Sequence, residues 1–213
     1  MTRRAYIEMV RRQIYGGQPS DDATITINLV NLYLEQAIAY AAKTNYKENI
    51  AIGGISYVNN SFYTTFKGLS VTADEQFIWK ITLPQIPFGI GADEGISTLQ
   101  FKDGDTNQLS LPVVWLTQNQ KTYYQNMRGI PNKLLAYSEG KSVYAISTIL
   151  LNAYTANVTL ISGGDSTDLS SNLNVPNDYF PVMMQYLQSQ LLLEKAQPVD
   201  STNDGIDIPA KTT

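Results

Sequence analysis

The chain of 213 residues contains no cysteine and no histidine. These absences exclude disulfide bonds, thiolate zinc sites, thiol nucleophiles and imidazole bases, and with them a Ser-His-Asp triad. Charged residues make up only 16% of the chain, against about a quarter in typical soluble domains. Neutral polar residues take their place, and the net charge of −4 provides no basic field of the kind that marks a dedicated nucleic-acid-binding protein.

Long apolar runs are also missing. Glu8, Arg11 and Arg12 interrupt the apolar residues near the N-terminus, so this segment does not have the form of a secretory signal. No stretch approaches the ~20 apolar residues that a membrane span needs. We therefore expect synthesis in a cytosol and no membrane partner. Hydrophobic residues still amount to 43% of the chain, which is enough for a real core.

Helical periodicity is present near both ends of the chain. Apolar spacing by three and four predicts a short helix over residues 2–15, a long helix over 23–45 and a third over 177–196. The two longer helices have apolar faces too wide to leave in water. We therefore expect residues 23–45 and 177–196, which include Leu34 and Leu187, to pack together although the middle of the chain separates them.

Between residues 49 and 175 the pattern is that of antiparallel strands. Short β-branched and aromatic runs alternate with turn residues. The clearest hairpin is at Ser138-Glu139-Gly140-Lys141; Ser138 and Lys141 match a Ser–Lys motif, but they flank a turn instead of sharing a helical turn. The predicted strands are 50–58, 61–66, 77–83, 97–102, 108–116, 133–138, 142–147 and 157–161.

The sequence thus predicts an α+β chain in which the terminal helices pack together and an antiparallel β-sandwich or barrel-like region is inserted between them. The expected parts are a helical N-terminal part over residues 1–48, a β-rich domain over 49–175, a helix over 176–198 that packs on the N-terminal helices, and an extended tail over 199–213. No internal repeat is present.

One acidic stretch resembles the start of a calcium loop. Asp103 and Asp105 place oxygen ligands at alternate positions, but Gln108 and Val114 stand where an EF-hand needs glycine and glutamate. A hairpin turn is the better interpretation, and weak calcium binding at Asp103 and Asp105 stays open. We expect no catalytic residue, no structural metal, no cofactor and no enzymatic activity.

Basic residues are concentrated in the first helix, at Arg3, Arg4, Arg11 and Arg12. On a helix, Arg4 and Arg11 share a face. These side chains either form a solvated face beside the apolar stripe or contact a partner through its acidic groups or phosphates. Both interpretations stay open, and the four arginines are candidate partner-binding residues.

The C-terminal tail has few apolar anchors. Ile206 and Ile208 alternate around Asp207, as in a strand added to the edge of a sheet, and Pro209 ends the segment. We expect residues 199–213 to be ordered by a neighbouring subunit or ring protein, with Ile206 and Ile208 as partner-binding residues.

Aromatic residues offer a second possibility. Tyr63, Trp115, Tyr123 and Tyr124 can either pack the sheet or line a sugar-binding face, and packing is the more common role. The alternative function is therefore a carbohydrate- or cell-surface-binding β-sandwich module.

Both ends of the chain resemble the head-to-tail connector, or adaptor, proteins of short-tailed bacteriophages, and most closely the ring proteins beneath the portal in crAss-like phages. At the N-terminal end the resemblance rests on Arg3-Arg4-Ala5-Tyr6-Ile7 and on Gly17-Gln18-Pro19-Ser20-Asp21-Asp22 before a long helix. At the C-terminal end it rests on Val175-Pro176-Asn177-Asp178-Tyr179 before a helix and on the segment from Pro198 to Gly205. The β-rich middle matches only in type.

The resemblance implies a structural virion protein that forms a ring, usually of twelve subunits, at the head–tail junction. The partners would be other copies of the chain, the portal protein and neighbouring tail ring proteins. DNA would pass through the lumen only as cargo, and no catalysis is implied.

Overall fold

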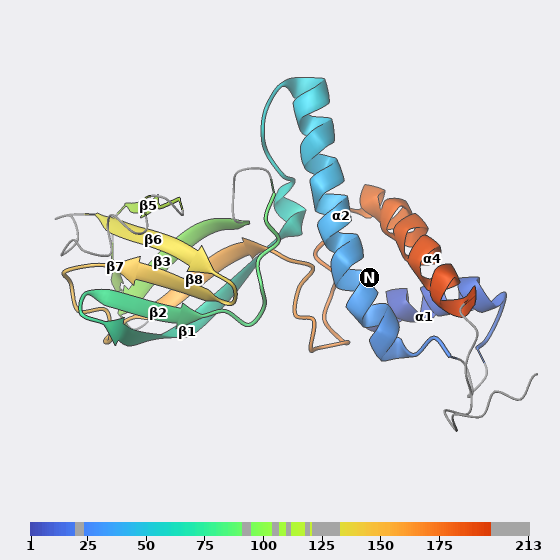
Figure 1. Ribbon diagram of the computed structural model, residues 1–213, viewed down its shortest axis with the longest axis horizontal. Coiled ribbons are helices and arrows are strands. Elements are labelled where there is room, and N and C mark those ends of the chain that lie inside the picture. The colour runs from blue at the N-terminus through green and yellow to red at the C-terminus, as the bar shows by residue number, and fades with distance from the viewer. Residues whose placement is uncertain are drawn as a thin grey trace, which may run out of the picture.

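The computed structural model of the chain describes residues 1–19, 24–90, 95–103, 107–109, 112–117, 120 and 133–196. It confirms the predicted α+β class. Helices from the two ends of the chain pack together. The segment that separates them in the sequence forms a mostly antiparallel, near-closed barrel, which lies beside the helices (Figure 1).

Three helices form the helical layer: α1 (Arg3–Tyr15), α2 (Ile27–Gly53) and α4 (Phe180–Ala196). Threonine hydroxyls cap the first two, because Thr2 accepts a hydrogen bond from the amide of Ala5 and Thr26 accepts one from that of Leu29. The cap at Thr26 explains why α2 begins at Ile27 and not at the predicted residue 23. A short 3₁₀ turn, η2 (Asn177–Tyr179), precedes α4.

The predicted strand over residues 50–58 is wrong. The helix α2 continues through Ile50 and Ile52 to Gly53, and Gly54 ends it with a left-handed backbone at φ 66°. Ile50 and Ile52, and then Ile55 and Tyr57, are each two positions apart as strand residues are, but all four are exposed and lie in no described strand. The strand prediction failed because α2 runs on until the left-handed Gly54 stops it.

Eight strands form one sheet in the order β4-β3-β8-β1-β2-β7-β6-β5. Neighbouring strands are antiparallel except β5 and β6, which are parallel. The predicted hairpin at residues 138–141 is confirmed by the pairing of β6 with β7. The strands are β1 (Tyr63–Glu75), β2 (Ile78–Thr82), β3 (Ile96–Asp103), β4 (Asn107–Leu109), β5 (Val113–Trp115), β6 (Leu134–Glu139), β7 (Ser142–Ile146) and β8 (Thr155–Ile161).

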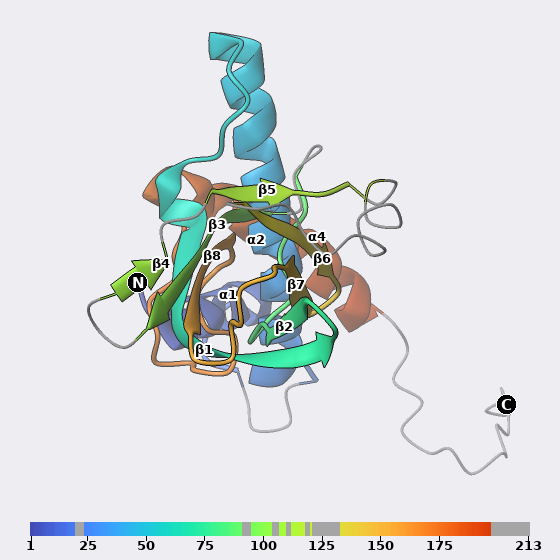
Figure 2. The same cartoon turned by 90° about the vertical axis from the view of Figure 1, so that its left-hand side faces the viewer.

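The long strand β1 allows the sheet to curl. Its first half pairs with β8 and its second half with β2, and the register shifts between Phe66 and Leu69. At this bulge Gly68 has φ 70° and donates its amide hydrogen to the side-chain oxygen of Asn157 at 3.0 Å. A bulge bends and twists a strand, so one strand serves both sides of the barrel (Figure 2).

Two main cores result. The barrel interior is filled by side chains such as Val71, Ile81, Phe101 and Val158. The helical core joins α1, α2 and α4 to the near end of the barrel, and its members include Leu34 and Leu187, both fully buried. The predicted packing of the terminal helices is therefore confirmed. Among the described helices, none is long and apolar enough to cross a membrane.

The helical core yields a direct stability test. Leu34→Asp or Leu187→Asp should abolish soluble folded protein, because each removes an apolar contribution of roughly 1.5–3 kcal/mol and adds a buried charge. The matched control is Leu192→Asp, since Leu192 is half exposed on the same helix as Leu187. Soluble yield and melting temperature measure the effect, and a folded Leu34→Asp variant with an unchanged melting temperature would contradict the packing.

Candidate functional site

Arg3 is a structural residue inside the chain. Its side chain is fully buried. One terminal nitrogen, Nη1, donates to Glu35 Oε1 at 2.6 Å and to Asn31 Oδ1 at 2.9 Å, while Nη2 donates to the carbonyl oxygen of Gly163 at 3.3 Å. Arg3 is therefore not on the surface where the sequence-based hypothesis placed it as a partner-binding residue.

The segment that follows β8 closes around this arginine. The amide of Arg3 donates to the carbonyl oxygen of Ser171, and the side-chain amide of Asn31 donates to that of Ser166. Gly163 approaches α2 so closely that a Cβ atom there would lie 2.1 Å from Ile38 Cδ1. The polar run after β8 is therefore a clamp between the barrel and the helices.

Two aspartates shape the clamp. Asp165 accepts hydrogen bonds from the hydroxyl and the amide of Thr167, and these lower the pKa of its carboxyl below the usual value. Asp168 accepts hydrogen bonds from the hydroxyl and the amide of Ser170, and these bonds likewise lower the pKa of the Asp168 carboxyl. Both carboxylates stay ionised at neutral pH and hold local turns.

The other three arginines of α1 lie together at the surface. Arg4 pairs with Glu8 at 3.0 Å, and Arg11 donates from Nε to the carbonyl oxygen of Ile25 at 2.9 Å. With Arg12 they line a surface hollow of 460 Å³. Arg4, Arg11 and Arg12 thus remain candidate partner-binding residues. Ile206 and Ile208, Tyr123 and Tyr124, and Asp105 lie outside the described residues.

Two long stretches of the packed helices α2 and α4 are almost free of charge. Residues 180–193 of α4 contain no charged side chain, and residues 27–42 of α2 contain only Glu35, which pairs with Arg3. Large side chains are nevertheless exposed on these stretches: Leu32 at 62%, Tyr40 at 48% and Leu193 at 64%. We call Tyr40, Tyr186 and Leu193 the α2–α4 patch; Tyr40 stacks on Tyr186 at 5.1 Å between ring centroids, and Leu193 lies two helical turns from Tyr186 on the same side of α4.

The C-terminal end of α2 projects from the molecule beyond the other helices and the barrel (Figures 1 and 2). Every residue from 50 to 57 is exposed, and this segment carries no charged side chain. Ile52 is exposed at 89% and Ile55 at 61%. Apolar side chains in such a position have no partner within the described part of the chain.

Where the projecting end of α2 meets the barrel, aromatic side chains line a cavity of 430 Å³. Tyr63 and Trp115, which the sequence suggested for a sugar-binding face, both contribute to it. Tyr46 and Tyr57, which sequence reasoning did not select, also contribute. The complete lining among described residues is Tyr46, Ser56, Tyr57, Val58, Asn60, Tyr63, Ile90, Gly95, Ile96, Ser97, Trp115 and Ile161.

Tyrosine–carboxylate contacts fasten α2 to the C-terminal segment. Tyr33 donates to Glu194 Oε1 at 2.5 Å, and this bond together with burial raises the pKa of Tyr33. Tyr179 donates a hydrogen bond to Glu48. The pKa of Tyr179 is raised, mainly by burial and also by this bond. A raised pKa keeps a phenol protonated, so both tyrosines act as hydrogen-bond donors to these carboxylates.

Within the described part of the chain, no three acidic residues are grouped closely enough to hold a metal ion. Comparison with known proteins assigns no family, because no protein-family model matches the chain and no curated protein matches it. The resemblance to phage connector proteins therefore stays a prediction. The α2–α4 patch, the projecting end of α2 and the aromatic cavity are the surfaces from which function can be argued.

The buried ion pair can be tested by comparing two arginines of α1. Arg3→Met should lower the free energy of unfolding by about 3 kcal/mol, because it breaks a buried ion pair. This value is at the lower end of the range for such pairs, since the side chain of Glu35 is 24% exposed. Arg4→Met should cost less than about 0.5 kcal/mol, since its pair with Glu8 is exposed. Chemical denaturation measures both changes, and equal effects of the two substitutions would contradict a clamp centred on Arg3.

Proposed function

We propose that the chain is a structural virion protein that forms a ring at the portal vertex of a short-tailed bacteriophage. The ring connects the head to the tail and lets DNA pass. Its partners are other copies of the chain, the portal protein and neighbouring tail rings. The chain acts without catalysis or a cofactor.

The uncharged α2–α4 patch is the observation that carries this proposal. Protein–protein interfaces are depleted of charge at their centre and enriched in aromatic residues, and a soluble monomer rarely exposes several large apolar side chains side by side. Here Leu32, Tyr40 and Leu193 are exposed on two packed helices in which residues 27–42 and 180–193 hold a single carboxylate. Such a face is suited to contact with another protein subunit.

The position of the exposed apolar groups favours a ring over a closed dimer. The α2–α4 patch and the projecting end of α2 are separate surfaces on the same helical layer. When two different surfaces of one chain meet on successive copies, the contact is heterologous, and heterologous contacts close into rings if the rotation permits. The net charge of −4 also suits a DNA conduit, because a strongly basic lumen would retain the duplex.

Assembly can be tested with two neighbouring leucines of α4. Seven residues make nearly two helical turns, so Leu193 lies on the same face as Tyr186, whereas Leu192 points about 100° away. Leu193→Asp should reduce ring formation at least about tenfold, which corresponds to about 1.4 kcal/mol per contact. Leu192→Asp is the matched control, because it places the same charge at the adjacent exposed position and should leave assembly unchanged.

The measurement is native mass spectrometry and electron-microscope class averages of the full chain, alone and co-expressed with the portal protein of the same genome. Rings of the wild-type chain under either condition support the proposal. A chain that stays monomeric under both conditions would overturn it, as would equal assembly of the Leu192→Asp and Leu193→Asp variants.

A further inference from the structure

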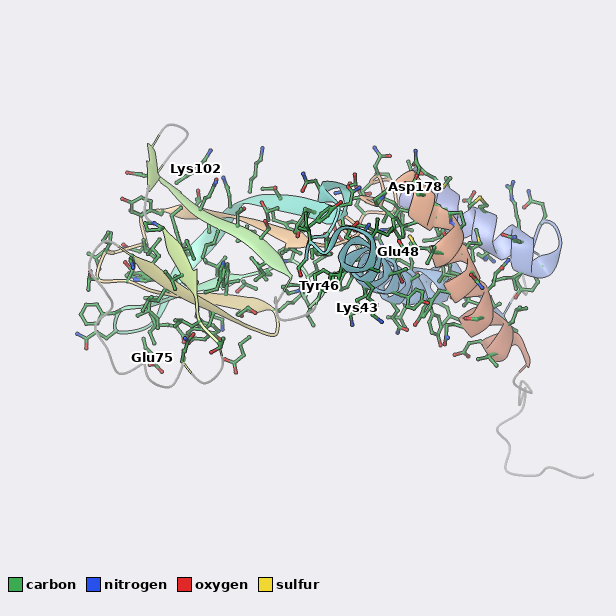
Figure 3. The ribbon with its side chains drawn as sticks, turned by 90° about the horizontal axis from the view of Figure 1, so that it is seen from above. Lys43, Tyr46, Glu48, Glu75, Lys102 and Asp178 are labelled. Carbon is green, nitrogen blue, oxygen red and sulfur yellow. The ribbon has the colours of Figure 1, made fainter. Side chains whose placement is uncertain are left out.

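The aromatic cavity is a binding site distinct from the α2–α4 patch. It lies where three parts of the fold meet: Tyr46 comes from α2, Tyr57 from the connection after α2, and Trp115 from the edge strand β5. Figure 3 shows Tyr46 on the side of α2 that faces the barrel. Tyr57 is exposed at 53%, so the cavity is reached from solvent. We infer that this cavity binds a neutral saccharide of one or two pyranose rings.

The composition of the lining selects the class of ligand. Aromatic faces stack on the apolar C–H faces of a sugar ring, because their π-systems carry a negative face. Ser56, Asn60 and Ser97 also line the cavity, and their side chains carry hydroxyl and amide groups that can exchange hydrogen bonds with sugar hydroxyls. Pockets for small molecules combine such apolar walls with a few polar groups.

Charge and size narrow the choice further. None of the described residues that line the cavity is a lysine, arginine, aspartate or glutamate. A charged ligand would lose its hydration there without gaining a charged partner, and that loss is costly. The volume of 430 Å³ lies within the range of about 300–1,000 Å³ for small-molecule sites. These properties fit an uncharged sugar better than an anionic or cationic ligand.

Residues from segments far apart in the sequence line the cavity, so it exists only in the folded chain. Ile96 and Ser97 belong to β3 and Trp115 belongs to β5, and these strands lie near opposite ends of the strand order in the sheet. Both therefore contribute at the place where the barrel does not fully close. Asn49 donates to the carbonyl oxygen of Tyr57 at 3.0 Å, which holds this part of the connection against the end of α2.

Trp115 provides a direct signal of binding. The chain has two tryptophans, and the other, Trp79, is buried in the barrel interior. The full chain is titrated with neutral sugars, and its tryptophan fluorescence is recorded. The panel is methyl glucoside, methyl galactoside, maltose, cellobiose and N,N′-diacetylchitobiose. At least one of these sugars should change the fluorescence, with a Kd of about 1 mM or lower. Glucuronic acid and N-acetylneuraminic acid are the anionic comparators and should bind more weakly. Calorimetry or ligand-observed NMR checks the affinities.

Two variants and one control make the assignment specific. Trp115→Ala and Tyr57→Ala should each weaken the affinity for the best sugar at least about tenfold, because each removes a stacking surface. Tyr40→Ala is the control, since Tyr40 has an exposure close to that of Tyr57 but belongs to the α2–α4 patch. It should leave sugar binding unchanged.

The outcomes separate this inference from the proposed function. No binding of any neutral sugar at a Kd of about 10 mM or lower, a preference for the acidic sugars, or unchanged binding in both the Trp115→Ala and Tyr57→Ala variants would overturn the sugar site. Ring assembly of the same variants is measured in parallel. If the chain binds sugar through Trp115 but forms no ring, the sugar site stands and the proposed function is wrong. If the chain forms rings but binds no neutral sugar, the proposed function stands and the sugar site is wrong.

Discussion

The burial of the Arg3 guanidinium is the interaction on which the arrangement of the two halves depends. A buried charge must be paired and hydrogen-bonded, and here the partners come from two segments far apart in sequence: Asn31 and Glu35 of α2, and the carbonyl of Gly163 after β8. Because these groups must converge on one side chain, the end of β8 is held against α2. The barrel therefore has a defined position on the helical layer, and the aromatic cavity at their junction has a defined shape.

The surfaces suited to binding lie away from this internal network. The α2–α4 patch belongs to the helices alone, whereas the aromatic cavity needs α2, the connection after it and residues of four barrel strands. Both are poor in charge, which agrees with the low share of charged residues in the whole chain. Their chemistry differs, however: the patch offers leucine and tyrosine to another protein surface, and the cavity combines aromatic faces with hydroxyl and amide groups.

Sequence reasoning found some site residues and misjudged the setting of others. The uneven distribution of arginine pointed to α1, and helical spacing places Arg3 on the buried stripe of this helix while Arg4 lies off it. The sequence did not reveal that the carboxylate of Glu35, 32 positions away, pairs with the buried Arg3 guanidinium. Tyr63 and Trp115 were suggested by their type, and they do meet in one cavity. The α2–α4 patch was missed, although the lack of charge in residues 27–42 and 180–193 was a signal that could have identified it.

The sequence by itself determined the helices at both ends, the strand-rich middle and the packing of Leu34 against the C-terminal helix, because apolar periodicity and wide apolar faces are local properties that only burial can satisfy. The tertiary structure alone decided that the sheet curls into a barrel, through the bulge at Gly68. It also decided which exposed groups meet. Long-range pairing depends on register, closure and buried charge partners, and these arise from contacts between segments that no local pattern specifies.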